Sequence, residues 1–286
     1  WRRPASFAQE SMLATEIVEA SRRPHLYRTA GPSIADPDRA FPRIIAHRGI
    51  NLSCPENTLP AFGAAIGLNV DEIELDIRCT KDGELVVIHD STLERTTNAV
   101  GIVRDCLWNE IADCDAGSWH SPQWKGVTIP RFEDVLKKFA GQVIMNVHIY
   151  DTGEDGYVVK RVKALAEQYD ASRTIYIAGD RDIMENAIQY APEIERCCLV
   201  EQKNWNLVDH ALRYHCKKLQ FFTEYCTETI VKKAHAAGIR CNLFYTNTAE
   251  AAEYYLGIGI DAILTDDPLQ IMSVVNKKTH IGVYSG

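Results

Sequence analysis

Short apolar runs rich in Ile, Val and Leu alternate with helical stretches along most of this chain. Eight runs are predicted to be strands: Arg43–His47, Glu72–Arg78, Gln142–Ile149, Thr174–Ala178, Arg196–Val200, Lys218–Phe222, Ile239–Tyr245 and Ala262–Thr265. The spacing of apolar residues between them predicts helices at Leu59–Leu68, Phe132–Phe139, Tyr157–Tyr169, Ile183–Tyr190, Thr227–Ala237 and Thr248–Leu256. This rhythm is typical of an α/β protein with a parallel sheet.

Eight strands with interleaved helices predict a closed (β/α)8 barrel, the TIM barrel. The 286 residues suit one such barrel of roughly 250 residues. An open doubly wound sheet is the alternative, but no glycine-rich dinucleotide turn follows the first strand. We therefore expect a TIM barrel over residues 43–286, preceded by an N-terminal extension, residues 1–42, that is helical at Phe7–Ala20 and irregular from Thr29.

A ninth apolar run, Glu84–His89, follows the second predicted strand too closely for a crossover helix. Asp82-Gly83 is the signal of a tight hairpin, so we expect an extra antiparallel strand and a small insertion after the second barrel strand. With Asp82-Gly83 as a two-residue loop, Asp76 lies opposite His89. The hairpin would thus place a carboxylate beside an imidazole.

The second predicted strand separates its apolar residues from its acids, which are Glu72, Glu74 and Asp76. Strands of a parallel barrel are buried on both faces, and buried carboxylates are costly unless they bind a cation. The alternative is an antiparallel strand with a wet face, where acids cost little. The parallel rhythm favours use of these acids in a metal or catalytic site.

Two further strands carry polar residues where barrel enzymes place their sites. The first strand ends in His47-Arg48-Gly49, and arginine is suited to bind phosphate with its planar fork. Asn146, His148 and Tyr150 share one face of the strand Gln142–Ile149 and its end. These side chains are candidates for the lining of a site.

Composition narrows the classes of function. With 46% hydrophobic and 24% charged residues, the chain is typical of a globular protein, and no apolar run approaches the length of a membrane span. A net charge of −8 without a basic stripe argues against nucleic acid as a partner. An acidic chain can still bind a small phosphate ester if its carboxylates hold a divalent cation. Oligomeric state is left open.

The nine cysteines are scattered and lack the spacing of metal ligands. We interpret them as reduced, mostly buried thiols, which favours a cytoplasmic location. The chain begins at Trp1, so a secreted or periplasmic protein with a removed signal peptide is the alternative.

Several motifs occur in order along the chain: His47-Arg48-Gly49, Pro55-Glu56-Asn57-Thr58, Glu74-Leu75-Asp76, Thr80-Lys81-Asp82-Gly83, His89-Asp90, Leu93–Asn98, Asp115–Ser118, Ile129-Pro130 and Gly259–Pro268. Together they resemble the signature of the glycerophosphodiester phosphodiesterase family. The resemblance implies a TIM barrel that hydrolyses a glycerophosphodiester to sn-glycerol 3-phosphate and an alcohol. It also implies that the enzyme uses a divalent cation, often Mg²⁺ or Ca²⁺.

The resemblance also implies roles for individual residues. His47 and His89 match the acid–base pair of the family, and Arg48 matches its phosphate-binding arginine. Glu74 and Asp76 match metal ligands. This chemistry is coherent, because a hard cation on carboxylates neutralises the diester while two imidazoles exchange protons with nucleophile and leaving group.

The chain departs from the family on the strand Gln142–Ile149. The family usually has Glu-x-Lys there, the Glu as a third metal ligand and the Lys on phosphate, whereas this chain has His148 and Tyr150. We expect His148 to be the third ligand, and imidazole favours Mn²⁺ or Zn²⁺ over Mg²⁺ or Ca²⁺. The two changes offset each other in charge, as in a retuned site.

Other residues are expected to support the site or contact substrate. Thr58 is predicted to cap the helix Leu59–Leu68, and Glu56 or Asn57 to brace a catalytic side chain. Phe244 keeps an aromatic ring where the family often has Trp, and Glu133 either joins this set or is an acid favoured at a helix start. Two alternative functions stay open: a hydrolase or lyase for another phosphodiester such as a lysophospholipid, and a barrel that binds phosphodiesters or a partner without catalysis.

Overall fold

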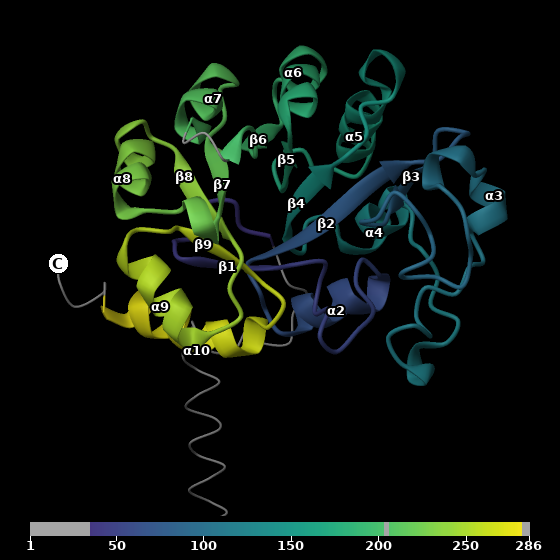
Figure 1. The fold of residues 1–286 in the computed structure, drawn as a ribbon, viewed down its shortest axis with the longest axis horizontal. Helices are drawn as coiled ribbons and strands as arrows, with labels where there is room; N and C mark the ends of the chain where they lie inside the picture. Colours follow the sequence, from purple (N-terminus) through teal and green to yellow (C-terminus); the bar gives the residue numbers. More distant parts are fainter. Residues whose placement is uncertain (1–34, 203–205, 282–286) are drawn as a thin grey trace, which may run out of the picture. The chain divides into compact units, whose positions relative to one another are not determined.

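Eight parallel strands close into a barrel in this computed structural model, which describes residues 35–202 and 206–281 (Figure 1). The barrel strands are β1 (Arg43–Ala46), β2 (Glu72–Cys79), β4 (Ile144–Ile149), β5 (Ile175–Gly179), β6 (Glu195–Cys198), β7 (Lys218–Phe222), β8 (Arg240–Phe244) and β9 (Ala262–Thr265). Each pairs in parallel with the next, and β9 pairs with β1 to close the ring. The predicted TIM barrel is confirmed, while the helix predicted at residues 7–20 lies outside the described residues.

Helices follow the barrel strands and surround them. They are α2 (Leu59–Gly67), α4 (Phe132–Phe139), α5 (Tyr157–Gln168), α6 (Arg181–Tyr190), α7 (Leu207–Arg213), α8 (Glu228–Ala236), α9 (Ala249–Gly257) and α10 (Pro268–Ile281), with α3 (Trp108–Ile111) in the insertion. Short 3₁₀ helices are η1 (Val103–Asp105), η2 (Pro122–Trp124), η3 (Glu154–Gly156) and η5 (Thr223–Tyr225). The sequence did not predict α3, α7 or α10.

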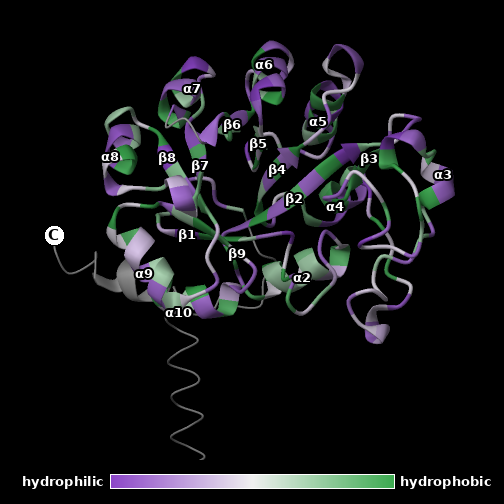
Figure 2. Ribbon diagram, in the orientation of Figure 1, coloured by the Kyte–Doolittle hydropathy of each residue, from purple (hydrophilic) through white to green (hydrophobic). Residues whose placement is uncertain are grey.

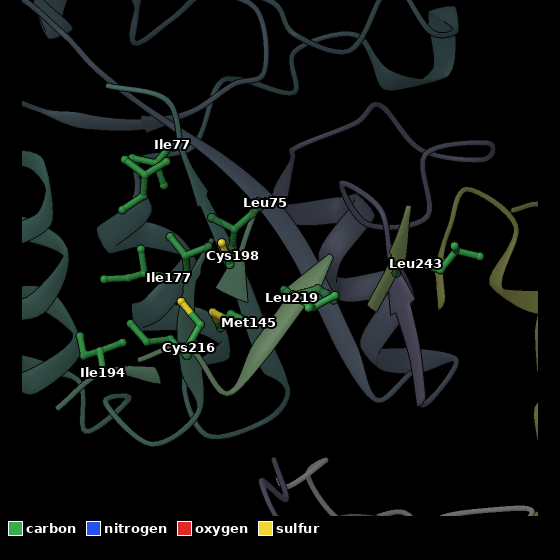
Figure 3. Packing of buried hydrophobic residues seen from close by; sticks show 14 of the residues in the cluster. Leu75, Ile77, Met145, Ile177, Ile194, Cys198, Cys216, Leu219 and Leu243 are labelled. Carbon is green, nitrogen blue, oxygen red and sulfur yellow. The ribbon is translucent and has the colours of Figure 1, made fainter. Parts of the chain in front are cut away.

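The main hydrophobic core lies between the strands and the helices around them. Leu75, Met145, Ile177 and Leu219 share one buried cluster with the apolar faces of the helices (Figure 3). On α4, burial at every third or fourth position selects Phe132, Val135, Leu136 and Phe139. Each such side chain contributes about 1.5–3 kcal/mol on burial, and the helices alternate hydrophobic and hydrophilic stretches accordingly (Figure 2).

One of the three acids of β2 is neutralised by the protein itself. Glu72 is 1% exposed and accepts hydrogen bonds from Arg43 at 3.0 Å and from the Tyr176 hydroxyl at 2.7 Å. This buried ion pair closes the end of the barrel where the strands begin. Glu72 therefore needs no metal ion, which separates it from Glu74 and Asp76.

The hairpin after β2 forms, but its predicted register is wrong by one residue. Strand β3 (Leu85–Val87) is antiparallel to β2, with Cys79 opposite Leu85 and Ile77 opposite Val87. Gly83 adopts φ +87°, and its amide donates to the Thr80 carbonyl at 3.0 Å, so the loop has three residues instead of two.

The slip in register moves the partner of Asp76 by one position. Asp76 now faces Ile88, whose amide donates to the Asp76 carbonyl at 3.0 Å. His89, which was predicted to lie opposite Asp76, is instead the next residue along.

The insertion between β3 and α4 folds over the loop that follows β1. His120 Nε2 lies 3.2 Å from the Asn51 carbonyl oxygen, and Trp124 Nε1 donates to the Ser53 carbonyl at 3.2 Å. The insertion therefore borders the end of the barrel at which the strands finish. Among the described residues, no helix is both long and apolar enough to cross a membrane.

Candidate active site

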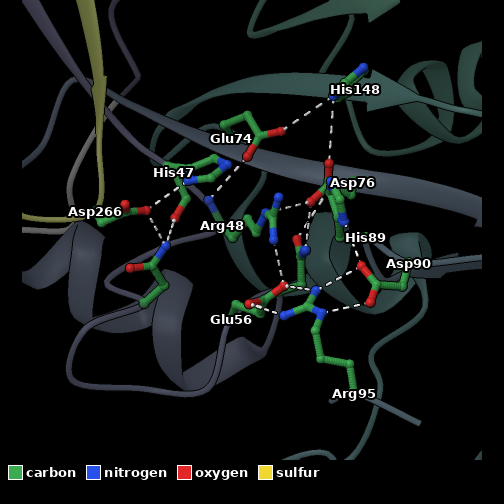
Figure 4. A network of polar contacts seen from close by, with 12 residues as sticks. His47, Arg48, Glu56, Glu74, Asp76, His89, Asp90, Arg95, His148 and Asp266 are labelled. Atoms are coloured by element: carbon green, nitrogen blue, oxygen red, sulfur yellow. Dashed lines mark hydrogen bonds and ion pairs between the residues drawn. The ribbon is translucent and has the colours of Figure 1, made fainter. Parts of the chain in front are cut away.

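The candidate residues meet at the carboxyl ends of the barrel strands. His47 and Arg48 follow β1, Glu74 and Asp76 project from β2, and His148 projects from β4 (Figure 4). Parallel pairing places Glu74 beside Asn146 and Asp76 beside His148, so their side chains share the inner face. Side chains that are far apart in the sequence are thus brought to one edge of the barrel, as predicted.

Glu74, Asp76 and His148 form a three-residue cluster suited to a cation. One ligand atom from each lies within 4.8 Å of the others. His148 Nδ1 is 3.6 Å from Asp76 Oδ1 and 3.9 Å from Glu74 Oε1. These separations are longer than hydrogen bonds and match atoms that surround a common ion.

A second cluster of possible metal ligands differs from this one, because its carboxylate is already hydrogen-bonded by the protein. His235, Cys241 and Asp261 also bring three ligand atoms within 4.8 Å, at the opposite end of the barrel. There, Asp261 already accepts hydrogen bonds from His235 at 2.8 Å and from Arg240 at 3.0 Å. Its carboxylate is satisfied by the protein, so this cluster is a structural link between β8, β9 and α8.

Glu74 and Asp76 are both buried, and their surroundings shift their pKa values in opposite directions. Burial, reinforced by the charge of Asp76, raises the pKa of Glu74 well above its usual range. Burial also works against ionisation of Asp76, but contacts with His148 and Arg48 outweigh it and lower the pKa of Asp76. A divalent cation would stabilise both ionised carboxylates.

Arg48 is held by three acids. Its backbone has φ +55°, a left-handed conformation that directs its amide to Glu74 Oε2 at 3.1 Å. Its Nη1 donates to Glu56 Oε1 at 2.8 Å, and its Nε lies 3.2 Å from Asp76 Oδ2 without forming a well-aligned hydrogen bond. The buried Nε is therefore a donor with spare capacity at the site.

His47 is paired with a carboxylate from the other end of the chain. Its Nδ1 lies 2.7 Å from Asp266 Oδ1, and Asp266 also accepts hydrogen bonds from Asn51 and, at 2.9 Å, from Asn247. Burial opposes ionisation of Asp266, but these contacts lower its pKa to about 2. An ionised carboxylate only accepts, so Nδ1 carries the proton and Nε2 is left for chemistry.

His89 has a matching carboxylate next to it in the sequence. Its Nδ1 lies 2.7 Å from Asp90 Oδ1, and Arg95 donates to both oxygens of Asp90. The hydrogen bonds from Arg95 keep the pKa of Asp90 well below its usual range. The Nδ1 of His89 is therefore the protonated nitrogen, as in His47.

Asn57 braces Asp76 from the loop before α2. Its Nδ2 donates to Asp76 Oδ2 at 2.7 Å, and its Oδ1 accepts from the Asp76 amide at 3.2 Å. Asn57 has φ +57°, a conformation that Asn tolerates better than most residues. Thr58 caps α2 through the Ala61 amide, as predicted.

Two of the remaining candidates contact the histidines, and one does not. The ring of Tyr150 lies 5.4 Å from His89 and 4.2 Å from His148, and the ring of Phe244 lies 5.0 Å from His47. Glu133 instead lies at the start of α4, where it accepts a hydrogen bond from Tyr169 at 3.0 Å. The structure does not bring Glu133 to the site.

Asp266, Asn51 and Arg95 contact the site without having been assigned a role from the sequence. Asp266 directly follows the last barrel strand, and this position at the carboxyl edge is a usable signal. Arg95 lies within the Leu93–Asn98 motif, which gave it no individual role, and Asn51 lies in a loop outside the motifs. Each also has a partner far away in the sequence, Asp266 for Asn51 and Glu56 for Arg95, so its place in the site depends on the folded chain.

Comparisons with known proteins show the family and the fold of this chain. The protein-family model described as "Glycerophosphoryl diester phosphodiesterase family" matches residues 47–270 of this chain. A "Glycerophosphodiester phosphodiesterase" from Caldanaerobacter subterraneus subsp. tengcongensis is 32% identical over 82% of this chain and 98% of its own length.

Solved structures show the same fold. The crystal structure of a glycerophosphodiester phosphodiesterase from Agrobacterium tumefaciens has a TM-score of 0.71 and 28% identity, over 81% of this chain and 99% of that one. An Oleispira antarctica phosphodiesterase in complex with sn-glycerol-3-phosphate has a TM-score of 0.76 and 24% identity, over 82% of this chain and 96% of that one.

Proposed function

This chain belongs to the glycerophosphoryl diester phosphodiesterase family, and from that premise we propose that it hydrolyses glycerophosphodiesters to sn-glycerol 3-phosphate and an alcohol by two-histidine acid–base catalysis. The family and the class of enzyme, a phosphodiesterase on a TIM barrel, agree with the prediction from the sequence. The observation that carries the assignment of roles is the pair of histidines, His47 and His89, each with Nδ1 on a carboxylate.

The residues present fit a divalent cation, as enzymes of this family generally require. Four connected carboxylates, Glu56, Glu74, Asp76 and Asp90, accompany the two guanidinium groups of Arg48 and Arg95, so acids outnumber bases by two in this network. We assign Glu74, Asp76 and His148 as the groups that hold the cation. When bound, it neutralises charge on the phosphate and makes phosphorus more electrophilic.

Arg48 would bind the phosphate. Its Nε is buried and lacks a well-aligned acceptor, so this donor is available to a phosphate oxygen. The two carboxylates that contact its side chain fix the direction of the group. Tyr150 stands where the family has Lys and would offer its hydroxyl beside the phosphate.

The two histidines would move one proton each. One imidazole, with Nε2 unprotonated, accepts the proton of the attacking hydroxyl as the new P–O bond forms, and the other, protonated on both nitrogens, donates its Nε2 proton to the leaving alcohol oxygen as the old bond breaks. Where the attacking hydroxyl is the glycerol's own, water then opens the resulting cyclic phosphate with the two roles exchanged. Asp266 and Asp90 keep each imidazole in the tautomer that presents Nε2 and stabilise it when it is charged. The protons balance, because one is taken up and one is released.

His148 gives this site a metal preference of its own. An imidazole in place of a carboxylate shifts the preference from Mg²⁺ or Ca²⁺ toward Mn²⁺ or Zn²⁺. The position of His148 supports this, since its Nδ1 lies close to the carboxylates of both Glu74 and Asp76. Replacing His148 by Glu should restore a preference for Mg²⁺ or Ca²⁺, and an unchanged preference would remove His148 from the ligands.

The substrate is a small molecule, and we propose a reducing compartment for the reaction. All nine cysteines are free thiols, six of them buried. Nucleic acid stays an unfavoured partner because of the net charge of −8.

A substrate and metal panel tests the proposal. The protein is stripped with chelator and offered glycerophosphocholine, glycerophosphoethanolamine and a lysophospholipid, each with Mg²⁺, Ca²⁺, Mn²⁺ or Zn²⁺. Release of sn-glycerol 3-phosphate from the first two supports the proposal. Turnover of the lysophospholipid alone would favour another phosphodiester, and binding without any turnover would favour a barrel that has lost catalysis.

A further inference from the structure

Arg95 contacts two carboxylates of the candidate site, those of Asp90 and Glu56. It belongs to the insertion after β3, and its side chain is 42% exposed. Its Nε and Nη2 donate to Asp90 at 2.6 and 2.9 Å, while its Nη1 and Nη2 donate to Glu56 at 2.9 and 2.8 Å. The guanidinium is thus forked onto two acids at once (Figure 4).

Each of these acids also contacts a residue to which we assign a role in catalysis or phosphate binding. Asp90 holds the Nδ1 of His89 at 2.7 Å. Glu56 Oε1, which accepts from Arg95, also accepts from Arg48 Nη1 at 2.8 Å. A continuous chain of contacts therefore runs from an imidazole to the arginine proposed to bind phosphate.

We propose that Arg95 is a positioning residue that fixes the His89–Asp90 pair and the Arg48–Glu56 pair relative to each other. The inference rests on the proposed function of those two pairs. A planar guanidinium has five donors in a rigid fork, so it sets the angle between two carboxylates, which a single ammonium cannot do. Through Arg95, the insertion thus helps to align the phosphate bound by Arg48 with the imidazole of His89.

The exposure of Arg95 separates this role from a contribution to stability. Ion pairs that are open to solvent stabilise a fold by only about 0–1 kcal/mol. A loss of Arg95 should therefore leave thermal unfolding almost unchanged while it disturbs catalysis. Groups that orient catalytic side chains commonly cost about 10–100-fold when removed.

The test compares Arg95→Met with Arg131→Met. Arg131 is the control, since its guanidinium also makes a forked contact, with Asp134 in place of two acids of the site; both hydrogen bonds are 2.9 Å long and the side chain is 31% exposed. Arg95→Met should lower kcat about 10–100-fold and raise KM, whereas Arg131→Met should leave both near the wild-type values. Arg95→Lys keeps the charge but not the fork, and should recover only a small part of the loss.

Double variants identify the route of the effect. In an Asp90→Asn background, Arg95→Met should have a much smaller effect on kcat, because its path to His89 is already cut. In a Glu56→Gln background, it should have a smaller effect on KM, because its path to Arg48 is already cut. Full additivity in both backgrounds would contradict the inference.

A readout that needs no turnover separates this inference from the proposed function. Long-range ¹H–¹⁵N spectra report which nitrogen of His89 is protonated, and Arg95→Met should shift His89 away from its single Nδ1-protonated tautomer. Wild-type kinetics and an unchanged tautomer in Arg95→Met would overturn the inference. If the wild-type protein turns over no glycerophosphodiester, the proposed function fails and the tautomer still decides the role of Arg95.

Discussion

Replacing Asp266 by Asn tests the pairing of His47 most sharply. The carboxylate of Asp266 accepts hydrogen bonds from His47, Asn51 and Asn247. The substitution keeps the shape of the side chain but removes its charge. It also gives the side chain an NH₂ group, which must face at least one of these donors.

The pKa of Asp266 gives the size of the effect. Its pKa is about 2 in the fold against an ordinary 3.8, a difference of roughly two pH units. At about 1.36 kcal/mol per unit, the ionised carboxylate stabilises the fold by roughly 2–3 kcal/mol. Because the Asp266 side chain is 18% exposed, we reduce this contribution to about 1–2 kcal/mol for solvent screening.

The pH dependence follows from the direction of the shift. The pKa of Asp266 is lower in the fold than in the unfolded chain, so its contribution is present above about pH 4 and is lost as the pH falls toward 2. Urea unfolding at pH 7 should show Asp266→Asn less stable by about 1–2 kcal/mol, with about half that difference at pH 3. The value of kcat should fall about 10–100-fold, because His47 loses the carboxylate that orients it.

The neighbouring residue supplies the control. Asp267 accepts a hydrogen bond from the Gln270 amide at 3.2 Å at the start of α10, a position where Asn serves as well as Asp. Asp267→Asn should therefore change neither stability nor kcat appreciably. Equal stability losses at pH 7 and pH 3 for Asp266→Asn, or a wild-type kcat, would refute the reasoning.

Three further predictions concern the frame of the site. Gly49 has φ +83°, and a Cβ there would lie 2.7 Å from Ala61. Gly49→Ala should therefore lower the free energy of unfolding in urea by at least about 2 kcal/mol. At Gly67 a Cβ would meet nothing within 4 Å, so the control Gly67→Ala should be neutral or stabilising. Asn57→Gly keeps the left-handed backbone but removes both hydrogen bonds to Asp76, and should lower the free energy of unfolding by about 1–3 kcal/mol. A cation at 100 times its Kd should raise the free energy of unfolding by about 2.7 kcal/mol, seen as a higher Tm that chelator reverses; a Tm indifferent to every cation would contradict a metal site.

The parts of the fold with strong local periodicity could be predicted from the sequence. The separation of acids from apolar residues on β2 placed Glu74 and Asp76 on the inner face, because a strand alternates its faces wherever it lies. Helix α7, only seven residues long, was missed because so short a segment has too few turns to show a helical period.

The register of the hairpin could not be fixed from the loop residues alone. The signal Asp82-Gly83 is compatible with two-residue and three-residue loops, and the contact of the Thr80 hydroxyl with the Glu84 amide at 2.9 Å decides for the longer one. A slip of one residue exchanges the faces of a strand, so the predicted partner of Asp76 changed with it.

The partners of the catalytic candidates were hidden for a different reason. Asp266 is 219 residues from His47, and Arg95 is 39 residues from Glu56. Closure of the barrel and folding of the insertion bring them together, and no local pattern encodes either contact. Individual candidates could therefore be found in the sequence, but not the network that orients them.

The central claim is that His47 and His89 carry out metal-dependent hydrolysis of a glycerophosphodiester. It is tested most directly by release of sn-glycerol 3-phosphate from glycerophosphocholine, measured on chelator-treated protein before and after Mn²⁺ is restored. We predict no release before, turnover after, and loss of that turnover in both His47→Ala and His89→Ala with their folds intact. Turnover that persists in either variant, or that needs no cation, would contradict the account.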